Sequence, residues 1–146
     1  MKSIRTYFLV ADETEARILE NLGVGKGVHQ LSHYTEKDSG SAPNDFADQP
    51  GSSQGAGGQA RHGVDPSTTE RENARNVFAA YLGDMIKGAS QKGKFDRLVI
   101  SAPPQMLGVL RNALGGEVEI YADLDKNLVN TPTNDLAKHL SGVVAV

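Results

Sequence analysis

The sequence predicts an α/β fold, a single domain over residues 1–146 with a mixed five-stranded sheet and flanking helices. Two patterns indicate it. Three strand-like segments joined by tight turns open the chain, and strands joined in this way pair antiparallel. Two later strand-like segments each follow a helical segment, which is typical of parallel strands with right-handed crossovers. With 146 residues, of which 38% are apolar, the chain is long enough for one such core.

The first half of the expected sheet lies at the beginning of the chain. Residues 4–11 become apolar on both faces, as in a central buried strand, and 12–14 predict a turn. A half-polar second strand is expected at 16–22, followed by a glycine-rich hairpin loop at 23–27. The third strand, 28–34, alternates with polar residues and is therefore expected near an edge.

Residues 36–66 have almost no apolar periodicity and are rich in Gly, Ser, Pro, Asp and Gln. We expect a long flexible loop at about 36–66. Loops of this length within a compact domain are usually functional or disordered.

A helix follows this loop. Two overlapping capping boxes, 67–70 and 69–72, compete for its beginning, and Gly93 is expected to end it. Its apolar residues recur at helical spacing: Ala74, Val77, Phe78, Tyr81, Leu82, Met85, Ile86 and Ala89.

The last third predicts strand, helix, strand and helix. Residues 98–102 form a wholly apolar segment, as expected for a buried parallel strand. Pro103-Pro104 favours the beginning of a helix, and Gly115-Gly116 favours its end. A fifth strand is expected at 118–122 and a last helix at 133–140. The order βββαβαβα predicts the strand order 3-2-1-4-5, which is the ribonuclease-H-like arrangement.

Composition excludes several classes of protein. The chain has no cysteine, which excludes disulfide scaffolds, zinc knuckles, Fe–S clusters and thiol nucleophiles. A net charge of -3 argues against coating nucleic acid by bulk positive charge. No apolar run approaches a signal peptide or a membrane span, so we expect a cytoplasmic protein without a membrane partner.

The expected strand order raises the question of a nuclease, which needs clustered carboxylates to hold two metal ions. Asp12 and Asp123 follow expected strands, but Asp96 lies at the opposite end of its strand. Asp12 is more simply a turn residue. The histidines complete no ligand set, and the glycine-rich segment 55–59 lacks the Lys-Ser/Thr of a P-loop. We therefore predict no metal and no cofactor, and a homodimer through the fifth strand stays open.

The middle of the sequence carries the positive charge. Residues 57–97 hold 7 basic and 5 acidic residues, a net of +2, whereas the segments before and after are negative. Phosphate contacts are expected from such residues, among them Arg71 and Arg75. A solvated helix face without a partner is the alternative.

Gly57-Gly58-Gln59 lies within the long loop. Glycines permit positive φ and close approach of the backbone to a substrate, and a following N–H can stabilise an oxyanion. The triplet resembles the catalytic signature of peptide-chain release factors. In the middle domain of the archaeal and eukaryotic factors, as here, it precedes a long helix and an apolar strand. A chance triplet in a segment rich in Gly and Gln is the alternative.

Further motifs are spread over nearly the whole chain: Leu9-Val10-Ala11-Asp12, Ala16-Arg17, Asp48-Gln49-Pro50-Gly51, Arg61-His62, Phe95-Asp96-Arg97-Leu98-Val99, Ala102-Pro103-Pro104, Leu107-Gly108, Leu110-Arg111 and Asp125-Lys126-Asn127-Leu128. As a set they resemble the bacterial host attachment proteins, which are grouped with relatives of the archaeal and eukaryotic release factors as family 12.

The resemblance implies a ribosome- or tRNA-associated translation factor that hydrolyses the peptidyl-tRNA ester. Gly57, Gly58 and Gln59 would then be catalytic, and Arg61 and His62, with Arg71 and Arg75, would bind RNA. With 146 residues in one domain, we expect no domain that reads stop codons. Two alternatives stay open, a non-enzymatic protein that influences attachment to host cells and a small regulatory binding module, so enzymatic activity is undecided.

Overall fold

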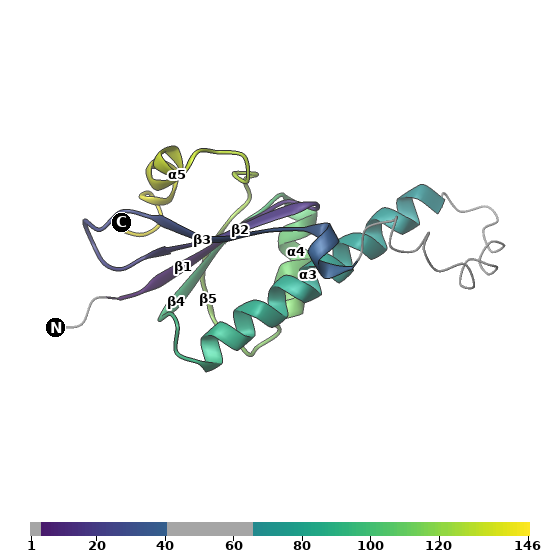
Figure 1. The fold of residues 1–146 in the computed structure, drawn as a ribbon, viewed down its shortest axis with the longest axis horizontal. Coiled ribbons are helices and arrows are strands. Elements are labelled where there is room, and N and C mark those ends of the chain that lie inside the picture. Colours follow the sequence, from purple (N-terminus) through teal and green to yellow (C-terminus); the bar gives the residue numbers. More distant parts are fainter. Residues whose placement is uncertain (1–3, 41–65) are drawn as a thin grey trace.

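The computed structural model describes residues 4–40 and 66–146, with side chains described in the second part from Thr69 onward. The elements, in chain order, are β1 (Thr6–Ala11), β2 (Glu15–Asn21), β3 (His29–Thr35), the 3₁₀ helix η1 (Glu36–Ser39), α3 (Pro66–Gln91), β4 (Arg97–Ser101), α4 (Pro104–Leu114), β5 (Ile120–Leu124) and α5 (Thr133–Leu140). Apart from the 3₁₀ turn, this is the predicted order (Figure 1).

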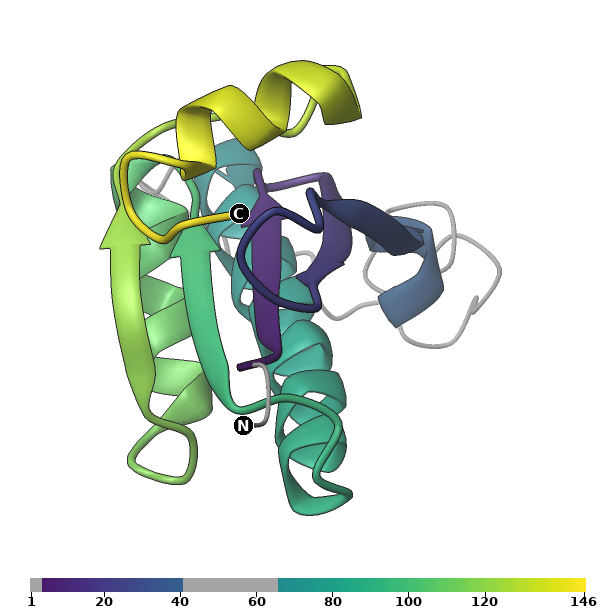
Figure 2. The same ribbon diagram turned by 90° about the vertical axis from the view of Figure 1, so that its left-hand side faces the viewer.

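The five strands form one mixed sheet in the order β3-β2-β1-β4-β5, as predicted. β1 pairs antiparallel with β2 and parallel with β4, and β4 pairs parallel with β5. All six residues of β1 are buried, which confirms its expected central position. β3 and β5 form the two edges (Figure 2).

Helices cover both faces of the sheet (Figure 1). Alternate residues of β1 divide between the two faces, because successive side chains of a strand point in opposite directions. Leu9 packs with α3 and α4 in the larger apolar cluster, where Phe78 and Leu110 are fully buried. Phe8 packs with α5 in the smaller cluster, together with the buried Leu136.

Glycines allow α3 and α4 to pack closely, and a glycine with positive φ follows each of these helices. A Cβ on Gly83 of α3 would lie 3.0 Å from the Ala113 Cβ of α4, so the missing side chain lets the helices approach. Gly93 follows α3 with φ of +69°, and Gly115 caps α4 with φ of +59°. Both helix ends were expected at these glycines.

The structure corrects some expected boundaries. β5 begins at Ile120 rather than at residue 118, because its pairing with β4 begins at Ile120; Val118 is buried in the loop before the strand. η1 occupies the first residues of the expected loop, and residues 41–65 lie outside the described part. α3 begins at Pro66, before the first residue of either expected capping box, so neither box marks the beginning of the helix. Val77, on the apolar stripe expected for this helix, is 36% exposed. The first turns of α3 extend past the sheet (Figure 1).

Candidate nucleic-acid interface

Two of the seven predicted site residues lie within the described part of the chain. Arg71 and Arg75 occupy the first turns of α3, four residues apart and therefore on adjacent turns of one face. The other five lie outside the described residues: Gly57, Gly58, Gln59, Arg61 and His62. The structure therefore defines the helix that follows the triplet.

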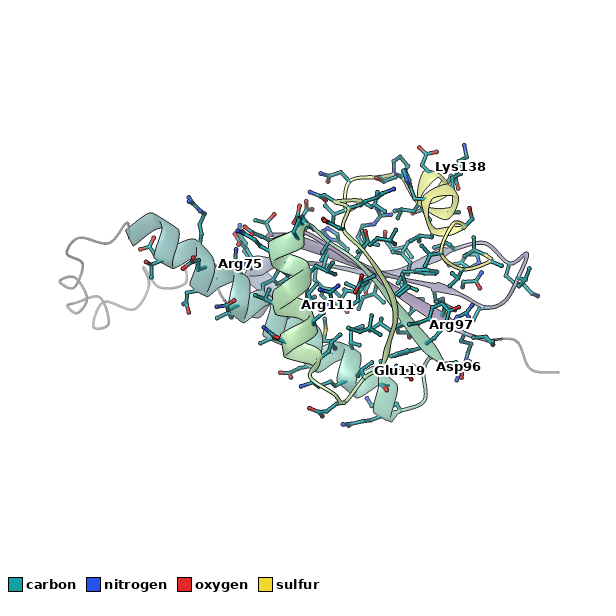
Figure 3. All side chains as sticks on the ribbon, turned by 180° about the vertical axis from the view of Figure 1, so that it is seen from behind. Arg75, Asp96, Arg97, Arg111, Glu119 and Lys138 are labelled. Atoms are coloured by element: carbon teal, nitrogen blue, oxygen red, sulfur yellow. The ribbon has the colours of Figure 1, made fainter. Side chains whose placement is uncertain are left out.

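The Arg75 side chain is directed toward the body of the protein (Figure 3). Its exposed fraction is only 16%, and its Nη1 lies 3.1 Å from Glu13 Oε2. Nη1 also donates to Gln105 Oε1 at 2.9 Å. Glu13 lies in the turn between β1 and β2, and Gln105 lies on the first turn of α4. Arg75 thus connects three elements, and Glu13 offsets its charge.

Arg71 differs from Arg75 in its surroundings. It is exposed, and no ion pair or hydrogen bond joins it to any other residue in the described ranges. Glu70 and Glu72 are its neighbours in sequence, but adjacent residues of a helix point in different directions. The guanidinium of Arg71 can therefore meet an external phosphate without first breaking a contact within the described part.

Two other basic residues of the middle segment are held by neighbours in the fold. Lys87 Nζ lies 3.1 Å from Glu117 Oε2. The guanidinium of Arg97 lies 4.5 Å from the centre of the Tyr121 ring, and its Nε donates to Thr6 Oγ1 at 2.9 Å. These contacts stabilise the fold.

Lys92 and Lys94 are exposed, but they lie at the opposite end of α3 from Arg71. With a rise of 1.5 Å per residue, the 21 positions from Arg71 to Lys92 span roughly 30 Å. The basic residues of the middle segment therefore do not form one continuous surface in the described part. The start of α3 is the part of this basic segment that bears on the predicted site.

The three carboxylates considered for a nuclease are separated and engaged. Asp12 Oδ1 accepts the backbone N–H groups two and three residues further on, at 2.9 and 2.7 Å, which is the turn role expected for it. Asp96 pairs with Arg5, and Asp123 pairs with Arg111. Among the residues that the structure describes, no group of three or more acidic or histidine side chains is placed to hold a metal ion.

Arg17 has a structural role that no local sequence pattern indicated. It is 8% exposed, and burial lowers its pKa because the charged form loses solvation. Its acceptors are all neutral: Gln30 Oε1 at 2.7 Å, Val129 O at 3.1 Å, Thr131 O at 2.5 Å and Thr133 Oγ1 at 2.9 Å. Arg17 thus fastens the segment before α5 to β2.

The described elements define a small α/β protein with a mixed five-stranded sheet and an exposed arginine, Arg71, near the start of its longest helix. Residues 5–140 match the model of the bacterial archaeo-eukaryotic release factor family 12, and the chain belongs to this family. The match confirms the expected membership of family 12. No curated protein matches the chain. No helix within 4–40 or 66–146 is long and apolar enough to cross a membrane.

Proposed function

We propose that this protein is a cytoplasmic, translation-associated factor that binds the ribosome or peptidyl-tRNA and promotes hydrolysis of the peptidyl-tRNA ester through Gly57, Gly58 and Gln59. Membership of a release-factor family over residues 5–140 carries this proposal. The matched range includes the triplet and the start of α3, where the exposed Arg71 lies.

The chemistry of the triplet fits ester hydrolysis. Water attacks the ester carbonyl carbon, the bond from that carbon to the tRNA oxygen breaks, and the departing oxygen takes up the proton that the water loses and becomes a free hydroxyl. The carbonyl oxygen becomes negative in the transition state, where a backbone N–H group stabilises it. In the proposal, the glycines bring the backbone close to the ester, and the Gln59 side chain positions the water.

The basic residues have two different roles in the proposal. Arg61, His62 and Arg71 contact RNA phosphates, because a guanidinium or imidazolium forms charge-assisted hydrogen bonds with phosphate oxygens. Arg75 fixes the start of α3 through Glu13 and Gln105, and it reaches RNA only where a phosphate displaces Glu13.

Co-sedimentation with ribosomes in a low-salt gradient tests the binding step. We expect the wild-type protein to co-migrate, and we expect a deletion of residues 57–59 and the variant Arg71→Glu to lose the ribosomal fraction. Lys138→Glu on α5 makes the same change in net charge far from the start of α3 (Figure 3) and should still co-migrate. Equal loss in both charge-reversal variants would indicate dependence on net charge alone, and absence of the wild type from the ribosomal fraction contradicts the proposal.

Single-turnover hydrolysis of peptidyl-tRNA on purified ribosomes tests the chemical step. We expect Gln59→Ala to slow hydrolysis by about 10²-fold, the order seen when a group that acts in the transition state is removed. Co-sedimentation of this variant should be unchanged. An unchanged hydrolysis rate would remove Gln59 from the mechanism while leaving the binding step intact.

A further inference from the structure

A groove of about 440 Å³ lies between the edge strand β3 and the second half of α3. Its apolar lining includes Ile18 of β2, Leu31 of β3 and Met85 of α3. Leu31 is 46% exposed, although it lines the groove together with Ile18 of the larger apolar cluster. The groove is therefore apolar surface that the described part of the chain leaves partly uncovered, and its volume lies within the range of small-molecule sites, roughly 300–1,000 Å³.

Gly88 of α3 keeps this groove open. A Cβ added there would meet nothing within 4 Å, and its φ is not positive, so neither packing nor backbone conformation in the described part requires glycine. A glycine within a helix is destabilising relative to alanine. Gly83, five residues earlier, differs because it permits the contact with Ala113.

The two ends of the groove carry opposite charges. Asp84, Gly88 and Lys92 are spaced by four residues and so lie along one stripe of α3 and the turn after it. Lys94 also lines the groove at the same end as Lys92. Neither ammonium forms an ion pair with a residue of the described ranges. One end is thus basic, and the acidic Asp84 lies roughly 12 Å from Lys92 along the helix axis.

We propose that this groove binds a small apolar molecule with one anionic group, such as a medium-chain carboxylate. The anionic group lies at Lys92 and Lys94, and the apolar part covers Leu31 and Met85 in the space beside Gly88. Asp84 fixes the orientation, because it repels an anion from the other end. This site is separate from the start of α3 and does not depend on the proposed action on the ribosome.

Titration of the full chain, followed by ¹H–¹⁵N NMR, tests the site with three eight-carbon probes. We expect octanoate to bind more tightly than octanol, and octanol more tightly than octylamine. The amide signals of Ser32, Gly88 and Lys92 should shift. Lys92→Gln and Lys94→Gln should each weaken octanoate binding by about two- to fivefold, as expected for an exposed ion pair, and leave octanol binding unchanged.

Two leucine variants distinguish the groove from other apolar surface. Gly88→Leu fills the groove and should abolish binding of all three probes. Gly108→Leu, at a glycine of α4 that also has nothing within 4 Å of an added Cβ, should bind octanoate as the wild type does. Gly88→Ala, a smaller change that favours helix, should weaken binding and keep the fold even if the leucine variant unfolds.

Three results would overturn the proposal: octanoate shifts confined to residues outside the groove, equal affinity for the three probes, or octanoate binding unaffected by a folded Gly88 variant. Ribosome co-sedimentation of Gly88→Leu gives the independent readout. The ribosomal fraction of this variant should equal that of the wild type. Loss of octanoate binding in the groove can thus be distinguished from loss of ribosome binding.

Discussion

At the residue scale, Arg17 shows how the fold accommodates a buried charge without a carboxylate. Burial of an ion is costly unless its hydrogen bonds are satisfied. The guanidinium donates to the backbone carbonyls of Val129 and Thr131 and to the side chains of Gln30 and Thr133. Two of these four bonds satisfy carbonyl oxygens in the segment before α5, so the arginine and this segment depend on each other.

Replacement of Arg17 by methionine therefore leaves buried carbonyl oxygens without a donor. We expect Arg17→Met to lower the free energy of unfolding by about 2–4 kcal/mol. Arg111→Met is the matched control, because Arg111 pairs with Asp123 at the surface, with exposed fractions of 49% and 33%. That change should cost less than about 1 kcal/mol. Urea unfolding of both variants measures the difference, and equal losses would contradict the structural role of Arg17.

Tyr7 gives a pH dependence with a defined sign. Burial raises the pKa of the Tyr7 phenol above its ordinary value of 10.0; Glu20 and Tyr34 raise it further, and Arg5 opposes the shift. The folded state thus keeps the proton at a pH where the unfolded state loses it. The contribution to stability is complete below pH 10.0 and is lost as the pH rises toward the folded pKa.

We therefore expect the free energy of unfolding to fall less steeply above pH 10.0 in Tyr7→Phe than in the wild type. The phenylalanine keeps the ring that stacks on Phe95 at a centroid distance of 4.8 Å. Tyr121→Phe, at a 52% exposed position, should follow the wild-type slope. Urea unfolding at a series of alkaline pH values measures the slopes, and parallel curves for all three proteins would exclude the effect.

At the scale of elements, Arg75 joins α3 to α4 and to the turn after β1. We expect Arg75→Met to destabilise the protein, whereas Arg71→Met should change stability by no more than about 0.5 kcal/mol. A double-mutant cycle with Glu13→Gln isolates the ion pair, and the expected coupling is about 0.5–1 kcal/mol, because Glu13 is 39% exposed. Zero coupling would show that Arg75 acts through packing and Gln105 alone.

The elements also show what could be predicted from the sequence. α5 was predicted at its observed bounds, since the helical spacing of its apolar residues, Leu136, Ala137 and Leu140, is a local pattern. β5 was placed two residues too early, because its ends depend on pairing with β4, which has an irregularity between Leu98 and Val99. The contacts of Arg75 with Glu13 and Gln105 could not be predicted, because these residues lie 62 and 30 positions away in the sequence, and its role in RNA binding stays a prediction.

The groove beside β3 could not be predicted either, because it is formed by residues that are distant in the sequence. Its lining comes from β1, β2, β3 and α3, so no segment of the sequence contains it. Leu31 was expected on an edge strand, and Met85 was expected on the apolar stripe of the helix. Their side-by-side position follows from the strand order, which had been predicted, but the open space at Gly88 follows from packing, which had not.

At the scale of the whole molecule, α3 belongs to two environments. From Phe78 onward it contributes buried residues to the larger apolar cluster. Residues 70–77 are exposed or only partly buried, and this part extends past the sheet (Figure 1). β1, by contrast, is buried throughout and has a paired strand on each side. The free energy of local opening should therefore vary along the chain, since it is small where opening breaks few buried contacts.

Hydrogen exchange measures this difference directly. We expect the amides of β1 to exchange only through global unfolding and those of residues 70–77 to exchange orders of magnitude faster, through opening of the helix start alone. Arg75→Met should accelerate exchange at 70–77, because the helix start loses the contacts of Arg75 with Glu13 and Gln105. The amides of β1 should still exchange only through global unfolding, so their rates should change only as far as the free energy of unfolding changes. Uniform exchange along α3 in the wild type would contradict this prediction. It would show that the helix start, with the contacts of Arg75, is as stable against local opening as the part of α3 that packs in the core.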